Sequence, residues 1–176
     1  MPGDRLIPLT RGAYAVVCDE DYEALILSNW HLHDDGKGKR YAVRNVRLPN
    51  GRRSKMQMHR EIVNMHGIFI PPRMVVDHWD GDGLNNRNIN LFVASPGDNN
   101  HNRDYDNPWG YRGVTRLPSG RFQAQISYCG SKQYLGVYPT PAAAGSMYDV
   151  KARELFGRFA ITNEHLRMPA PEEAPF

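Results

Sequence analysis

The stretch DHWDGDGLNNRNINL, residues 77–91, decides how the middle of this chain folds. It follows the apolar run Met74–Val76 and leads into a second apolar run, Asn90–Val93. Both runs are short and rich in side chains that favour strands, whereas glycine and asparagine favour turns. We therefore expect two strands joined by a loop, with one histidine, His78, set among carboxylates and asparagines.

The segment Ser95–Asp98, read as SPGD, has the features of a helix start. Serine suits the N-cap, proline suits the first helical position, and a carboxylate at the third position closes a capping-box-like contact. In such a helix Asn99 lies in the first turn, and Asn102 and Arg103 lie on the same face by three- and four-residue spacing. The order strand, loop, strand, helix predicts that these side chains point back toward the strands.

Asp77 and Asn99 supply hard oxygens of the kind that magnesium prefers, and His78 beside them can act as a general base. A calcium-binding EF-hand loop does not fit: with Gly83 as its fixed glycine, the first and last ligand positions fall on His78 and Ile89. Zinc is disfavoured because the segment lacks paired imidazoles or cysteines. A purely structural role, with asparagines in turns and a buried histidine, is the remaining alternative.

The motif residues resemble those of the HNH endonuclease family, in the His-Asn-Asn variant of phage and intron-encoded homing endonucleases. The resemblance covers residues 58–104 and rests on these pieces: His59-Arg60, Val76-Asp77-His78, Asn85-Asn86, Asn90-Leu91, Asn99-Asn100 and Asn102-Arg103. It implies a ββα-metal nuclease module, which agrees with the order of elements expected above.

By this resemblance His78 is the general base that activates water, and Asp77 and Asn99 hold a single divalent ion, Mg²⁺ or Mn²⁺. Asn90 braces the loop and the histidine ring. Asparagine rather than histidine stands at the last motif position, and His101, two residues later, is the imidazole that can substitute. The residues placed in support of the site are His59, His101, Asn102 and Arg103.

Residues 108–163 contain three strand-like runs, around Val114, at 122–126 and at 134–137, separated by turn sequences. A helix follows, with Thr140 as N-cap, a proline at its first position and Gly157 as its stop. The pattern predicts a three-stranded antiparallel sheet with one packed helix. The other face of that sheet is left free.

The same region resembles the plant APETALA2 and ethylene-response-factor DNA-binding domain, which also occurs in phage and bacterial HNH proteins. The shared pieces are Tyr111–Val114, Gly120–Phe122, Leu135-Gly136, the helix at 142–149 and Gly157. The resemblance implies that the sheet enters the major groove of double-stranded DNA. The expected DNA contacts are Arg112, Arg116, Arg121, Lys132 and Tyr134. Where plant domains usually carry basic or tryptophan readers, this chain has Thr115, Leu117, Ser119 and Ser127.

The composition is typical of a soluble globular protein, with 40% apolar and 23% charged residues among 176 and a formal net charge of +3. The charge is +3 in residues 1–57, −3 in 58–107, +5 in 108–163 and −2 in 164–176. An acidic middle between basic flanks is expected if the middle holds a cation and the flanks meet a polyanion.

Cys18 and Cys129 are far apart in the sequence and form no C-x-x-C pair, so neither a disulfide framework nor a cysteine zinc site is indicated. No apolar run is long enough to span a bilayer, and the first residues lack the pattern of a signal peptide. We therefore expect a cytoplasmic protein, in a bacterium or a phage-infected host cell, with no membrane partner.

Together the patterns predict an α+β fold with a β-rich region at 1–57, an HNH module at 58–107, an APETALA2-like domain at 108–163 and a disordered tail at 164–176. The predicted function is metal-dependent cleavage of double-stranded DNA by a homing-type HNH endonuclease. The alternative is a DNA-binding regulator in which the HNH segment is a non-catalytic scaffold. RNA is disfavoured because its deep major groove does not admit such a sheet. The oligomeric state stays open.

Overall fold

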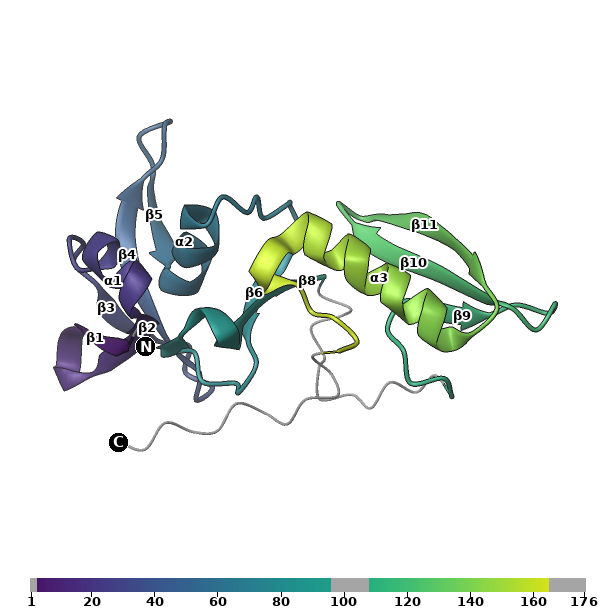
Figure 1. The fold of residues 1–176 in the computed structure, drawn as a ribbon. Helices are drawn as coiled ribbons and strands as arrows, with labels where there is room; N and C mark the ends of the chain where they lie inside the picture. Colours follow the sequence, from purple (N-terminus) through teal and green to yellow (C-terminus); the bar gives the residue numbers. More distant parts are fainter. Residues whose placement is uncertain (1–2, 96–107, 165–176) are drawn as a thin grey trace. The chain divides into compact units, whose positions relative to one another are not determined.

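The computed structural model describes residues 3–95 and 108–164. These residues form a mixed α+β structure, as predicted, in which strands predominate (Figure 1). The chain divides into two compact units, residues 1–67 with 76–91 and residues 68–75 with 92–176. Among the described residues there is no helix of the length and apolarity needed to cross a membrane.

The first sheet of the first unit contains β1 (Asp4–Pro8), β2 (Tyr14–Cys18) and β7 (Asn85–Asn86). β1 and β2 are antiparallel, and the two-residue period of β2 buries Ala15 and Val17 completely. β7 runs parallel to β2, with Asn85 opposite Val16 and Asn86 opposite Val17. The N-terminal strands therefore share a sheet with part of the segment 77–91.

The second sheet of this unit is antiparallel, in the order β3 (His31–Asp34), β4 (Arg40–Arg47) and β5 (Arg53–Gln57). The turn between β4 and β5 is closed by the Leu48 N–H, which donates to the carbonyl oxygen of Arg52 over 2.9 Å. Gly51 in this turn adopts a φ of 78°, a conformation that favours glycine. The unit also contains the helices α1 (Asp19–Leu25) and α2 (Met58–Met65).

The two strands expected on either side of the central loop are β6 (Val75–His78) and β8 (Leu91–Ala94), which pair in a two-stranded sheet. Between them lie β7 and the short 3₁₀ helix η2 (Asn88–Asn90). The helix predicted to follow Ser95 falls on 96–107, outside the described residues. The complete ββα-metal arrangement therefore stays a prediction.

The second unit contains the predicted sheet and helix (Figure 1). The strands lie in the order β11 (Ser131–Tyr138), β10 (Phe122–Tyr128) and β9 (Val114–Arg116), and they are followed by α3 (Pro141–Phe156) and η3 (Gly157–Phe159). Thr140 caps α3, because its Oγ1 accepts a hydrogen bond from the Ala143 N–H over 3.2 Å. The core between sheet and helix is formed by Val114, Phe122, Ala124 and Ala144.

Gly113, just before β9, holds a crowded position with a φ of 70°. A Cβ atom there would overlap the backbone carbonyl oxygen of Gln125 and the ring of Tyr148. Gly120 adopts a similar φ of 80° in the turn between β9 and β10, but its nearest neighbour would be the Arg116 side chain at 3.9 Å. Substitutions at the two glycines therefore distinguish the cost of backbone strain from that of steric overlap.

The substitution Gly113→Ala is expected to lower the free energy of unfolding of the second unit by about 3 kcal/mol or more, since a strained φ adds to overpacking against a backbone atom. Gly120→Ala, the matched control, meets only the strain and is expected to cost roughly 1–2 kcal/mol. Denaturant titrations followed by circular dichroism measure both. Equal losses in the two variants would contradict the crowding seen at Gly113.

Candidate functional site

His78 is the last residue of β6 and only 1% of its surface is exposed, whereas Asp77 before it is half-buried. Adjacent residues of a strand point to opposite faces, which on its own would separate the two side chains. Here the strand ends, and the Asp77 Oδ1 accepts a 2.9 Å hydrogen bond from the backbone N–H of His78. The carboxylate is thereby held close to the peptide that carries the imidazole.

The His78 ring is oriented by Asn86, whose Oδ1 lies 3.3 Å from the histidine Nε2. The amide nitrogen of Asn86 donates to the carbonyl oxygen of Leu84 over 3.1 Å, which leaves the amide oxygen to face the ring. An amide oxygen accepts a hydrogen bond but cannot donate one, so the neutral ring carries its proton on Nε2. The lone pair of the imidazole is therefore on Nδ1.

Burial lowers the pKa of His78 below its ordinary 6.5, because the charged ring loses its hydration. The hydrogen bond to Asn86 and the nearby carboxylates, with Asp77 first among them, oppose this shift without reversing it. The ring is therefore neutral at pH 7 and able to accept a proton.

His59, in α2, packs against the edge of His78, with ring centroids 4.8 Å apart and planes at 85°. Tyr41 of β4 lies 5.8 Å from His59 and 6.2 Å from His78. His59 is 3% exposed, and its Nδ1 is buried without a hydrogen-bond partner among the described residues. Burial first, then the charges of His78 and Arg60, hold the pKa of His59 well below 6.5. The uncharged ring of His59 thus packs against one side of the His78 imidazole.

Asn90, which is 1% exposed, connects two parts of the loop after His78 by hydrogen bonds. Its Nδ2 donates to the Asp80 Oδ1 over 2.9 Å and to the carbonyl oxygen of Asn85 over 2.7 Å, and its Oδ1 accepts from the Asp80 N–H over 3.1 Å. Its backbone oxygen accepts from the Trp79 N–H over 2.8 Å. Asn90 thus braces the loop, while the polar contact to the His78 ring comes from Asn86.

Cross-strand register assigns the residues of the second unit's sheet to its two faces. Phe122, Ala124 and Ile126 of β10 are buried on the side of α3, so the residues between them point to the opposite, free face. Residues directly opposite each other share a face. The pairs that lie on the free face are Gln123 with Thr115, Gln123 with Val137, Gln125 with Tyr134, and Ser127 with Lys132.

Three of the residues predicted to contact DNA belong to this free face. Lys132 and Tyr134 are exposed, Tyr134 to 65%. Arg121 precedes the buried Phe122, is exposed, and donates to the carbonyl oxygen of Val137 over 3.2 Å. The face therefore presents two cations and one aromatic ring among glutamine, serine and threonine side chains and Val137.

Arg116 and Arg112 lie elsewhere. Arg116 is opposite Phe122 and so shares the helix side of the sheet, where its guanidinium carbon lies 5.3 Å from the centroid of the Trp109 ring. Arg112 is 2% exposed, and its backbone N–H donates to the Asn163 Oδ1. A side chain this buried is not presented to a duplex, so Arg112 is left out of the DNA contacts proposed below.

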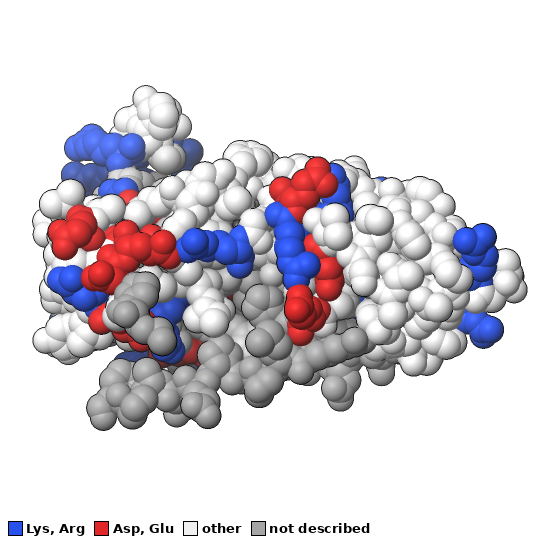
Figure 2. All heavy atoms as spheres, in the orientation of Figure 1, with Lys and Arg blue, Asp and Glu red and all other residues white. Residues whose placement is uncertain are grey.

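Basic residues also gather at the turn between β4 and β5 in the first unit, where Figure 2 shows a blue cluster at the upper left. The exposed members are Arg47, Arg52, Arg53 and Lys55. On helix α3 the basic residues are instead neutralised by ion pairs, Lys151 with Glu154 and Arg153 with Glu164.

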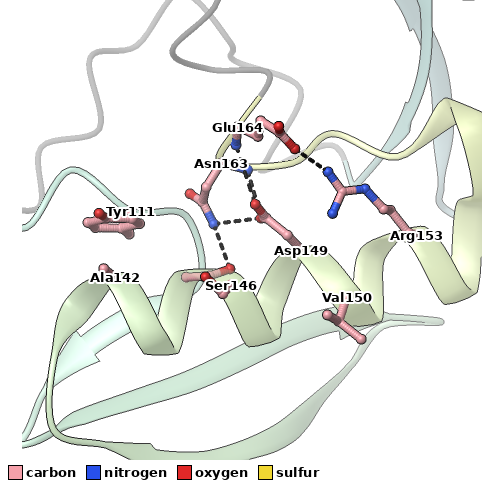
Figure 3. Close-up of a pocket in the computed structure, with 9 residues that line it drawn as sticks. Tyr111, Ala142, Ser146, Asp149, Val150, Arg153, Asn163 and Glu164 are labelled. Atoms are coloured by element: carbon pink, nitrogen blue, oxygen red, sulfur yellow. Dashed lines mark hydrogen bonds and ion pairs between the residues drawn. The ribbon is translucent and has the colours of Figure 1, made fainter.

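A groove of about 570 Å³ runs beside α3 in the second unit (Figure 3). At its centre the Asn163 Nδ2 donates to the Asp149 Oδ1 over 2.9 Å and to the carbonyl oxygen of Gly145 over 3.2 Å. Because the buried polar groups at its floor are used in these hydrogen bonds, they fix the segment after η3 to the helix.

No family model matches the chain. The chain is 30% identical over 156 residues to an uncharacterised HNH endonuclease of Acanthamoeba polyphaga mimivirus, and the match covers 88% of this chain and 76% of the viral protein. The chain belongs to the HNH endonuclease family.

Two plant proteins are similar to a smaller part of this HNH chain. A putative AP2/ERF and B3 domain-containing protein of rice is 44% identical over 64 residues, which is 36% of this chain and 19% of the rice protein. An AP2/ERF and B3 domain-containing transcription repressor of Arabidopsis thaliana is 40% identical over 53 residues, 30% of this chain and 15% of its own length. The match to each plant protein thus covers less than a fifth of its length.

The structure brings together four of the residues that the HNH motif predicted, namely Asp77, His78, Asn90 and His59. The other residues that the motif predicted for the site lie outside the described part of the chain: Asn99, His101, Asn102 and Arg103. Sequence reasoning missed Asn86 as the partner of the imidazole, although Asn86 belongs to the quoted motif. No pattern in the sequence indicated Tyr41, because only tertiary packing brings β4 next to His78.

The stability of this HNH protein is expected to fall as the pH drops below about 6.5, where the unfolded histidines take up protons. In the folded chain the pKa of His59 is depressed, so its contribution is complete above the unfolded pKa and is lost on acidification. One such group adds a slope of up to about 1.4 kcal/mol per pH unit. Denaturant titrations at a series of pH values measure it.

The variant His59→Gln is expected to flatten this slope, because glutamine takes up no proton. Asn64→Gln, in the same helix α2 and exposed, is the matched control, because neither side chain takes up a proton, and it should retain the slope of the parent protein. A slope that is unchanged in the His59 variant would show that the buried ring does not govern acid unfolding.

Proposed function

We propose that the chain is a metal-dependent endonuclease of the homing type, which hydrolyses phosphodiester bonds of double-stranded DNA. The observation that carries the proposal is the state of His78: a buried, neutral imidazole with its proton on Nε2 toward Asn86, and Asp77 at the same strand end. Membership of the HNH endonuclease family supports the reaction class.

In this proposal His78 Nδ1 takes a proton from the water that attacks the phosphorus atom. Asn86 holds the ring from the other nitrogen, so the base does not have to reorient, and His59 limits its tilt. A general base of this kind contributes on the order of 10²–10⁴-fold to the rate. Asn90 keeps the loop, and with it the Asn85-Asn86 segment, in place.

The residues present suit a hard divalent cation. Asp77 is half-buried and its Oδ1 accepts a hydrogen bond from the backbone N–H of His78, and Asn99, outside the described residues, would add an amide oxygen. Carboxylate and amide oxygens with water are the ligands that Mg²⁺ prefers. When bound, Mg²⁺ or Mn²⁺ would supply positive charge to the phosphate and to the departing oxygen.

For the second unit we propose that the free face of the β9–β11 sheet lies in the major groove of the duplex. The exposed Arg121, Lys132 and Tyr134 give it charge and a polar aromatic edge, and the glutamines between them can hydrogen-bond base edges. The similarity to AP2/ERF domain-containing plant proteins supports this use of the unit. Arg116, beside Trp109 on the helix side, would meet a phosphate at the rim of the groove.

A second candidate function is a DNA-binding regulator without nuclease activity. The observation that favours it is the 1% exposure of His78, since a base must touch the water that it activates. In that case the Asn90 and Asn86 hydrogen bonds serve only to stabilise the fold. Cleavage and binding assays separate the two functions.

The parent protein is expected to convert supercoiled DNA that contains a target site to nicked or linear forms with Mg²⁺, and not with a chelator. His78→Ala should lower this rate by roughly 10²–10⁴-fold, because the base is lost. His33→Ala is the matched control and should cut normally. Gel electrophoresis of the products measures the rate and shows whether one or both strands are cut.

Binding without cleavage by the parent protein, on several DNAs that include its own genomic neighbourhood, would favour the regulator. Cleavage that survives in the His78 variant would refute the assignment of the base while leaving the nuclease class intact.

Removing the cation of Lys132 by Lys132→Ala is expected to weaken DNA binding at low salt and to reduce the slope of log K against log salt by about 0.9, the value for one phosphate contact. Lys151→Ala on α3, whose lysine pairs with Glu154, is the matched control. Fluorescence anisotropy with a labelled duplex at several salt concentrations measures both. A slope that falls in the Lys151 variant and not in the Lys132 variant would place the DNA on the helix side.

A further inference from the structure

A cluster of metal-binding side chains lies in the first unit and takes no part in the His78 site. Cys18 ends β2, and Glu20 and Asp21 belong to the first turn of α1. The Cys18 Sγ and one carboxylate oxygen from each acid lie within 4.8 Å of one another. Glu20 is exposed, Cys18 is half-buried and Asp21 is buried, so the cluster opens to solvent on one side.

His66, which follows α2, lies beside this cluster, in contact with Asp21. Its Nε2 lies 2.9 Å from the Asp21 Oδ1 and 3.3 Å from the Asn88 Nδ2. A protonated Nε2 satisfies the carboxylate but faces the amide N–H, and an unprotonated Nε2 satisfies the amide but faces the carboxylate lone pair. A cation bound between the Nε2 lone pair and the carboxylate oxygen removes this conflict.

Reversing the Asn88 amide does not resolve the conflict, because the same Nδ2 donates to the Glu20 Oε1 over 2.6 Å. A reversed amide would set its oxygen against that carboxylate. The proton pattern of the cluster is therefore fixed from both ends, with the imidazole nitrogen between them.

Asp21 is the independent sign that something is bound here. Its residue is 2% exposed, and its Oδ2 is buried without a hydrogen-bond partner among the described residues. Acids in the first turn of a helix interact favourably with the helix dipole, but that interaction does not require burial. A buried carboxylate oxygen without a donor is costly, and a bound ion is one of the few features that explain it.

Asn88 lies next to the cluster and forms hydrogen bonds with its ligands. Its backbone N–H lies 3.3 Å from the Cys18 Sγ, and its side chain holds the Glu20 carboxylate. Hydrogen bonds of this kind orient the ligands of protein metal sites. Burial raises the pKa of the Cys18 thiol, so binding of a cation would release the thiol proton to solvent.

We propose that Cys18, Glu20 and Asp21 form a zinc site, with His66 beside it on Asp21, that is separate from the Asp77 site. A donor set of one sulfur and two carboxylate oxygens suits Zn²⁺, whereas Mg²⁺ avoids thiolate. The role of the ion is structural: it joins the end of β2 to the start of α1, next to the residue that follows α2.

The zinc site would also stabilise the HNH loop, because Asn88 is the first residue of η2 and Asn90 is the last. Spacing in the sequence gave no sign of the site, since the histidine and the cysteine are far apart and only the fold brings them together. The proposal does not depend on the nuclease assignment.

Cobalt(II) is the probe for the test, because thiolate-bound cobalt gives a charge-transfer absorption in the near ultraviolet. Full-length protein without a histidine tag would be treated with a chelator and then titrated with Co²⁺. The parent protein should bind one Co²⁺ with this absorption, and Zn²⁺ should displace it, since zinc binds such sites more tightly than cobalt.

Cys18→Ser and His66→Gln are expected to weaken Co²⁺ binding by at least roughly tenfold, the smaller loss seen when even an outer partner of a metal site is removed. Cys129→Ser is the matched control, because Cys129 is the other free cysteine and is exposed, and it should bind like the parent. Elemental analysis of protein purified without chelator should find about one zinc per chain in the parent and in the Cys129 variant.

The parent protein itself provides the decisive outcome, since it does not rely on a variant that folds. Absence of the thiolate absorption in the parent would overturn the proposal, as would an absorption that persists in Cys18→Ser and disappears in Cys129→Ser. Circular dichroism of each variant identifies any that fail to fold. Because no DNA is present, these outcomes are independent of whether the protein cleaves DNA.

Discussion

The hydrogen bonds of the Asn90 side chain constrain the segment on which the His78 site depends. Its amide joins Asp80, two residues after the imidazole, to Asn85, at the start of β7. Such a loop, rich in glycine and asparagine, has many accessible conformations, and each ordered residue costs about 1–2 kcal/mol of backbone entropy. Buried amide contacts offset part of that cost, and they place Asn86 where its oxygen meets the His78 ring.

The N-terminal strands complete this arrangement. The parallel pairing of β7 with β2 fixes Asn85 and Asn86 against two residues of an otherwise ordinary hairpin. Helix α2 brings His59 and strand β4 brings Tyr41 to the same imidazole. Burial by these neighbours also keeps the imidazole neutral, so the packing that positions the ring and the lowering of its pKa have one cause.

Local patterns in the sequence were enough to predict the strands of the second unit, its capped helix and the loop that follows His78. Which residues lie on each face of the sheet was harder to predict, because the strand register determines it. Arg116 is opposite Phe122 and therefore lies on the helix side, and Arg112 is buried near Asn163. Asn86 as the partner of His78 was not predicted either, since an asparagine in a loop has no periodic signal for its contact. Contacts such as those of Tyr41 and His66 depend on tertiary packing alone.

Two physical demands on the protein oppose each other, and the chain meets them with different side chains. Burial lowers the pKa of His78 below 6.5 and so favours its neutral form, but it also makes the imidazole almost inaccessible. Affinity for a polyanion requires exposed cations, which Lys132 and Arg121 provide on a sheet with its own core and its own helix. Because the buried imidazole and the exposed cations belong to separate compact units, substitutions of the residues that we propose to face DNA are expected to leave the hydrogen bonds around His78 undisturbed.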